Sequence, residues 1–154
     1  PTAPLYGVGG TAIGGYEPLQ TPDPPYLPEM ESSREYCLVL DLDETLVHYF
    51  EVGSEGTFLV RPGCDQFLTE MAEIYEVVIF TAAMQDVSKI YDLNDDIDAD
   101  WVLNQIDKPK RIKYRLYRQH ALPHGPVFVK DLSRIGRDLS KTIIVDNVAE
   151  NFQL

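Results

Sequence analysis

Short apolar runs alternate along the chain with stretches of helical spacing. Residues 37–40, 77–80 and 142–145 are rich in β-branched and other apolar side chains, as in strands that are buried on both faces. Between the first two runs, residues 62–75 repeat apolar positions at the spacing of an amphipathic helix. Strands that alternate with helical segments predict a parallel sheet in an α/β fold.

Other segments carry weaker patterns. Residues 46–61 predict a hairpin with its turn at 53–56. Residues 85–106 are expected to be helical at both ends, with a solvated acidic loop at 92–98. Residues 111–117 alternate basic and apolar side chains, which indicates a half-buried strand.

The first part of the chain has a different composition. Seven of the 11 prolines and five of the 10 glycines lie in the first 30 positions. Such a segment does not sustain a helix or a long strand. We therefore expect an irregular arm over residues 1–33 and one domain over residues 34–154.

Charge and cysteine content exclude several classes of protein. The net charge is −12, from 25 acidic and 13 basic residues, so direct nucleic-acid binding is not expected. The apolar runs are all too short for a transmembrane helix. The two cysteines form no disulfide framework and favour a reducing, intracellular compartment, the nucleus or the cytoplasm.

Polar side chains follow each of the three apolar runs. Asp41 and Asp43 follow the first run, Thr81 the second, and Asp146 and Asn147 the third. In parallel sheets, ligands bind at the carboxyl ends of the strands. Paired carboxylates there suit either a hard divalent cation or a division of labour between nucleophile and proton carrier.

Each of these residues also has an ordinary structural interpretation. Asp41 or Thr45 alone would serve as a helix N-cap, and Lys130 alone as a surface lysine. Their joint placement at strand ends favours a site, where Lys130 would offset charge on a phosphoryl group and Thr81 would bind one of its oxygens.

The order of five motifs resembles a known family. It is similar to the FCP/SCP-type phosphatases of the haloacid-dehalogenase superfamily, which include enzymes acting on the C-terminal repeat of RNA polymerase II. The motifs are LVLDLDETLVH at 38–48, RPG at 61–63, VIFTA at 78–82, VKDLSR at 129–134 and VDN at 145–147.

The resemblance implies a fold and a chemistry. The fold would be a haloacid-dehalogenase-like Rossmannoid with three layers, a central parallel sheet and a small hairpin insertion after the first motif. Relatives continue past the last motif, so the domain would be truncated at Leu154. Asp41 would form an aspartyl-phosphate, and Asp43 would protonate the leaving Ser or Thr oxygen and then activate water.

The resemblance also implies the remaining site residues. Mg²⁺ would be held by the Asp41 carboxylate, the Asp43 carbonyl and Asn147, with Asp146 alongside. Thr81 and Lys130 would hold the phosphoryl group. Arg118 would contact the phosphopeptide, and Thr45 would have a supporting role.

Three functions stay open. The first is a phosphoprotein Ser/Thr phosphatase, with the RNA polymerase II repeat as one substrate. The second is a non-catalytic binding scaffold on the same fold, similar to the import receptor of the mitochondrial inner membrane. The third is a phosphatase for small molecules. Retention of both Asp41 and Asp43 favours an enzyme, and the small hairpin, in place of a large lid, favours a protein substrate.

Overall fold

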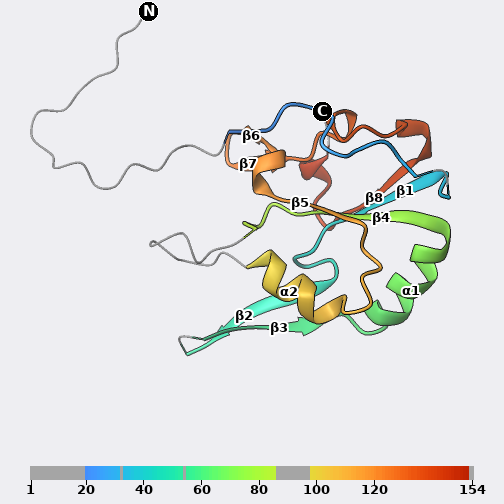
Figure 1. The fold of residues 1–154 in the computed structure, drawn as a ribbon. Helices are drawn as coiled ribbons and strands as arrows, with labels where there is room; N and C mark the ends of the chain where they lie inside the picture. The colour runs from blue at the N-terminus through green and yellow to red at the C-terminus, as the bar shows by residue number, and fades with distance from the viewer. Residues whose placement is uncertain (1–19, 32, 54, 86–97, 153–154) are drawn as a thin grey trace, which may run out of the picture.

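A parallel sheet forms the centre of the domain. The computed structural model describes residues 20–31, 33–53, 55–85 and 98–152. Its main sheet has the order β5-β4-β1-β8, and every neighbouring pair is parallel (Figure 1). These strands are β1 (Tyr36–Leu40), β4 (Tyr75–Phe80), β5 (Tyr114–Leu116) and β8 (Thr142–Val145).

The two central strands are buried on both faces, as their apolar runs predict. Val39 of β1 lies opposite Val78 of β4, and neither side chain is exposed. The same prediction was wrong for β8, where Ile143 is 46% exposed and Val145 is 43% exposed. This strand lies at the sheet edge, and among its described side chains Ile144 is the one that packs on a core cluster.

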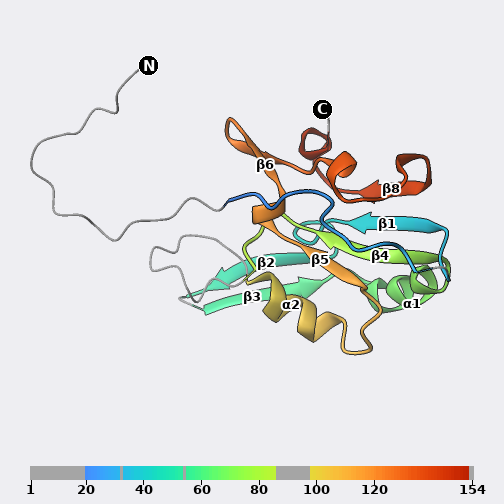
Figure 2. The same ribbon diagram turned by 45° about the horizontal axis from the view of Figure 1, so that its top comes forward.

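Alternate side chains of β1 and β4 point to opposite faces of the sheet and belong to two separate hydrophobic cores. One face of the sheet packs on α1 (Cys64–Ile74) and α2 (Ala99–Ile106), whose Leu68 and Leu103 are fully buried. The other face is covered by Leu27, Ile135 and neighbouring loop residues. Figure 2 shows these layers on opposite sides of the sheet.

Two hairpins flank the sheet. The first, β2 (Val47–Val52) with β3 (Glu55–Val60), confirms the predicted insertion. The second, β6 (Leu122–His124) with β7 (Val127–Val129), ends directly before Lys130. Four 3₁₀ turns complete the described residues: η2 (Arg118–His120), η3 (Leu132–Arg134), η4 (Leu139–Lys141) and η5 (Ala149–Asn151).

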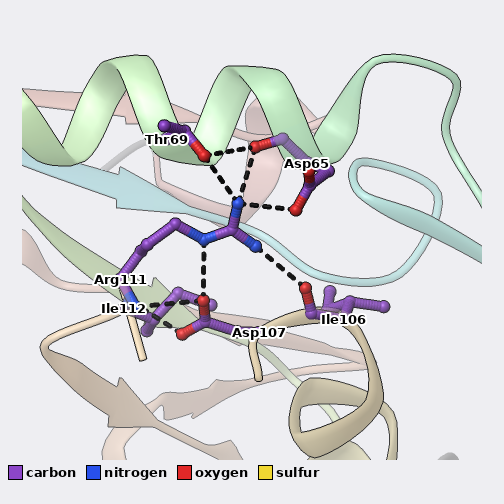
Figure 3. Close-up of polar contacts among 6 residues, drawn as sticks. All are labelled: Asp65, Thr69, Ile106, Asp107, Arg111 and Ile112. Atoms are coloured by element: carbon purple, nitrogen blue, oxygen red, sulfur yellow. Dashed lines mark hydrogen bonds and ion pairs between the residues drawn. The ribbon is translucent and has the colours of Figure 1, made fainter. Parts of the chain in front are cut away.

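β5 is shorter than the strand predicted over 111–117, and the Arg111 side chain lies among residues of α1 and the end of α2 (Figure 3). Its Nη1 donates to Asp65 Oδ1 and Thr69 Oγ1 on α1, at 2.7 and 2.8 Å. Its Nε donates to Asp107 Oδ1 at 3.0 Å, and Nη2 donates to the Ile106 carbonyl at 3.1 Å, both at the end of α2. The Arg111 side chain therefore links α1 to the end of α2.

The end of the predicted arm packs on the domain. Residues 20–31 contain no helix or strand, yet Leu27 is only 4% exposed. The rest of the arm at 1–19, and the acidic loop except Asp98, lie outside the described residues. Among the helices of the described ranges, none has the length and apolar character to cross a membrane.

Candidate active site

The sheet brings three predicted positions to one edge. Asp41 follows β1, Thr81 follows β4 and Asp146 follows β8, and these strands are neighbours with the same direction. Backbone pairing continues past the strands, since Asp41 N donates to the Val145 carbonyl at 2.9 Å. Their shared location follows from the parallel topology, as the sequence predicts.

Lys130 lies at the centre of this edge. It directly follows β7, and its residue is 1% exposed. Its Nζ donates to Asp41 Oδ1 at 2.7 Å and to Asp146 Oδ2 at 2.5 Å. A buried ammonium is costly unless carboxylates compensate it, and here two do. The surface-lysine interpretation is therefore wrong for Lys130.

Asp41 is buried and held at both oxygens. Thr45 Oγ1 donates to Asp41 Oδ2 at 3.0 Å, while Lys130 occupies Oδ1. Burial raises the pKa of the Asp41 carboxyl, and the Lys130 ammonium and the Thr45 hydroxyl oppose that rise by favouring the ionised form. The supporting role expected of Thr45 thus has a geometric basis.

Asp43 is also partly buried but is held differently from Asp41. Its Oδ1 is buried and has no hydrogen-bond partner among the described residues. Burial raises the pKa of the Asp43 carboxyl, and the negative charges of Glu44 and Asp41 raise it further. The pKa of both carboxyls is thus raised by burial, but the Lys130 ammonium favours the ionised form at Asp41 alone. Two carboxyls in different environments can divide the roles of nucleophile and proton carrier.

The loop that carries both aspartates is tightly bent. Glu44 adopts a left-handed backbone with φ of 60°, and the Leu42 carbonyl accepts from the N–H groups of Leu46 and Val47. Arg61, the residue after β3, donates to the carbonyls of Thr45 and Glu44 at 2.5 and 3.1 Å. In the sequence, Arg61 is marked only by the RPG motif, because no local pattern reveals a contact across a hairpin.

Thr81 and Arg118 share one loop. Thr81 is 1% exposed, and its Oγ1 accepts from Ala83 N at 3.0 Å, which leaves its own O–H as a donor. Arg118 donates through Nε to the Ala82 carbonyl at 2.6 Å and through its backbone N–H to the Ala83 carbonyl at 3.1 Å. Its guanidinium lies 5.0 Å from the ring centre of Phe128, a partner that sequence spacing did not indicate.

Of the two polar residues that follow β8, Asp146 joins the buried cluster and Asn147 does not. Asp146 Oδ1 accepts from Val148 N at 2.9 Å and from Asn151 Nδ2 at 3.3 Å, and its side chain is fully buried. Asn147 is exposed, and with Thr45 it lines a mostly apolar hollow beside the site.

The predicted magnesium ligands are oxygen groups at this edge of the sheet. Within the described residues, no cluster of three or more His, Cys, Asp or Glu is arranged to hold a metal ion. The oxygen groups at the edge are nevertheless of the type that Mg²⁺ prefers, and the buried Asp43 Oδ1 has no hydrogen-bond partner in the described part of the chain. The residues present therefore fit a hard cation in their chemistry.

Two solved structures share the fold. One is Fcp1, described as an essential RNA polymerase II CTD phosphatase, with a TM-score of 0.57 and 24% identity over 78% of this chain and 39% of that chain. The other is a fission yeast Fcp1 variant bound to beryllium fluoride, with a TM-score of 0.56 and 22% identity over the same shares of the two chains. Fold and strand order thus define an α/β protein of the haloacid-dehalogenase-like class, as expected.

Within that class, residues 36–154 match the NLI interacting factor-like phosphatase family, and the chain belongs to this family. The human carboxy-terminal domain RNA polymerase II polypeptide A small phosphatase 2 is 37% identical over 150 residues, covering 86% of this chain and 51% of the relative. Human small phosphatase 1 is 36% identical over 151 residues, covering 86% and 54%. The chain therefore spans about half the length of these relatives, and the resemblance to the FCP/SCP type is confirmed.

Proposed function

We propose that this domain is a magnesium-dependent phosphatase for phosphoserine or phosphothreonine in proteins. One observation carries the proposal. Asp41 is held at both oxygens by Lys130 and Thr45, two residues away from Asp43, whose Oδ1 has no partner in the described part of the chain. The kinship with phosphatases supports the same reaction class.

The first step forms a covalent bond to Asp41. Its carboxylate oxygen attacks phosphorus, the bond from phosphorus to the serine or threonine oxygen breaks, and Asp43 gives its proton to that oxygen. Lys130 Nζ, already 2.7 Å from Asp41 Oδ1, stabilises negative charge beside the nucleophile. Thr81 donates its O–H to a phosphoryl oxygen.

The second step reverses the role of Asp43. Now ionised, it takes a proton from water, and the water oxygen attacks phosphorus and releases inorganic phosphate from Asp41. The role of Asp43 as proton carrier is supported by its burial, because a raised pKa lets the Asp43 carboxyl hold a proton until the alkoxide leaves.

Mg²⁺ is the cation we propose for this edge. The Asp41 carboxylate, the Asp43 carbonyl and the Asn147 side-chain oxygen would hold it, with Asp146 alongside. When bound it supplies positive charge next to the phosphoryl oxygens. The donors are all oxygen, which suits this ion better than zinc.

The substrate class is a phosphorylated Ser/Thr protein. The C-terminal repeat of RNA polymerase II is the substrate to test first, because the names of the human relatives refer to it. Both cysteines, Cys37 and Cys64, are free and buried, which supports an intracellular location in the nucleus or cytoplasm.

The direct test is hydrolysis of p-nitrophenyl phosphate and of a phosphoserine peptide at mildly acidic pH. We expect turnover with Mg²⁺, loss on chelation, and recovery on adding Mg²⁺ back. Asp41→Asn keeps the shape of the side chain but removes the nucleophile, and should lower kcat at least ~1000-fold. Glu73→Gln, an exposed carboxylate of α1, is the matched control and should keep full activity.

Three results would contradict parts of this proposal. Turnover without Mg²⁺, or an active Asp41→Asn variant, would refute the mechanism. Tight peptide binding without turnover would identify a scaffold instead. Turnover of small phosphate esters but of no phosphopeptide would identify a small-molecule phosphatase.

A further inference from the structure

Residues 25–30, which we call the strap, precede β1 and cross the face of the sheet that lies opposite α1 and α2 (Figure 2). Backbone N–H groups of Tyr26 and Leu27 donate to the carbonyls of Arg134 and Ile135 at 3.0 and 3.1 Å. Leu27 is 4% exposed and belongs to the core cluster on that face. The strap is thus docked by both hydrogen bonds and apolar burial.

Tyr26 of the strap touches two separate turns. Its ring meets His120 of η2 edge-on, with ring centres 5.3 Å apart at 68°. Its hydroxyl accepts from Arg134 Nε of η3 at 2.7 Å, and the Arg134 guanidinium lies 5.6 Å from the ring centre. One side chain therefore links η2 to η3.

Both turns are attached to residues of the candidate site. η2 begins at Arg118, which is bonded to the Thr81 loop through the Ala82 carbonyl. η3 begins two residues after Lys130. Short 3₁₀ turns have poor internal hydrogen-bond geometry and depend on outside contacts for their placement. Tyr26 supplies such a contact to each.

The two site residues differ in how much they need this contact. Lys130 Nζ is fixed by Asp41 and Asp146 and stays in place without help from the strap. Arg118 lies two residues from His120, the ring that Tyr26 contacts, and its guanidinium packs over Phe128. A loosened strap would therefore displace the Arg118 turn more than the nucleophile.

We propose that Tyr26 is a positioning residue for phosphopeptide binding, acting through the His120 end of η2 on Arg118. The inference rests on the proposed function and on the expectation, implied by the family resemblance, that Arg118 contacts the peptide. Loss of the Tyr26 ring should weaken peptide affinity and leave the chemical step at Asp41 nearly unchanged.

The test measures binding of a fluorescent phosphoserine peptide in the Asp41→Asn background, where no turnover is needed. Tyr26→Ala should raise Kd about fivefold, the scale of one lost aromatic contact. Tyr26→Phe keeps the ring against His120 and should restore most of the affinity. Tyr36→Ala removes an exposed tyrosine at the opposite end of β1 and should leave Kd unchanged.

A second measurement separates positioning from general destabilisation. With active protein, Tyr26→Ala should raise KM for the peptide while kcat for p-nitrophenyl phosphate changes less than twofold. In an Arg118→Ala background, Tyr26→Ala should add no further loss of affinity, because both changes act on one contact. If Tyr26→Ala does not fold, Tyr26→Leu, which keeps apolar bulk, takes its place.

The outcomes are distinct. An unchanged Kd in folded Tyr26→Ala, or an equal additional loss in the Arg118→Ala background, overturns the inference. Absent turnover in the wild type, with the Kd pattern as expected, overturns the proposed chemistry and supports the strap.

Discussion

At the scale of single residues, the site is organised by one buried lysine. Lys130 contacts Asp41 and Asp146, which lie 89 and 16 positions away in the chain. Motif order placed all three at the same edge of the sheet, since strand ends meet there. It did not show that one ammonium would bridge both carboxylates, because tertiary contact leaves no periodic signal in a sequence.

Asp43 shows how a buried carboxyl can lower the stability of the folded state. A carboxyl whose pKa is raised by folding binds its proton more tightly in the folded state than in the unfolded state. Stability therefore falls as the pH rises from the ordinary value of about 3.9 through the raised pKa, and the penalty is fully present above it. At neutral pH an ionised Asp43 opposes folding.

Asp43→Asn should consequently stabilise the protein at pH 7. We expect a gain of about 1 kcal/mol in the free energy of unfolding, typical of relief at an active site. Urea denaturation at pH 7 and at pH 4 measures it, and the gain should shrink at the lower pH, where a larger fraction of the Asp43 carboxyl is protonated. A gain that is equal at both pH values would show that the charge of Asp43 is not its cause.

At the scale of elements, β5 is shorter than the alternating pattern of the sequence predicts, and a polar contact lies at its start. The alternation over 111–117 predicted one strand, but β5 includes only Tyr114–Leu116. Arg111 has better partners elsewhere, because Asp107 is buried and accepts from Arg111 Nε and from the backbone N–H of Ile112. At this end of the segment, the hydrogen bonds and the ion pair with Asp107 outweigh the strand propensity of the sequence.

Arg111→Ala should be strongly destabilising for that reason. It leaves the Asp107 carboxylate buried without its guanidinium and cuts the link to Asp65 on α1 (Figure 3). Breaking a buried pair from one side costs about 3 kcal/mol, which urea denaturation would show as a lower midpoint. Lys113→Ala is the control, because its pair with Glu31 is exposed and contributes less than about 1 kcal/mol. Equal losses of stability in Arg111→Ala and Lys113→Ala would contradict the proposed link between the two helices through Arg111.

At the scale of the whole molecule, apolar runs predicted the layers but not how well each is covered. The runs at β1, β4 and β8 look alike in sequence, yet β8 is half exposed. Burial of a strand depends on what packs beside it, and a run of Ile and Val does not specify its neighbours. The N-terminal segment shows the reverse case, since Leu27 is buried within a stretch of proline-rich composition.

The charge distribution of the whole molecule leads to the last prediction. The chain carries a net charge of −12, and Asp41 and Asp146 share the single ammonium of Lys130 at one edge of the sheet, two residues from Asp43 in the case of Asp41. A cation bound there would join the ends of β1 and β8, and only the folded chain brings its ligands together. Mg²⁺ should therefore raise Tm, with about 2.7 kcal/mol of stabilisation at a hundredfold excess over Kd.

General screening of an acidic protein also raises Tm, so the comparison must separate the two effects. Scanning calorimetry in MgCl₂ and in KCl of equal ionic strength does so, and the rise should be larger in MgCl₂. Asp41→Asn removes one carboxylate from the site and should abolish the excess while it keeps the rise in KCl. An excess that persists in Asp41→Asn would place the bound ion elsewhere on the acidic surface, because a site at this edge requires the Asp41 carboxylate.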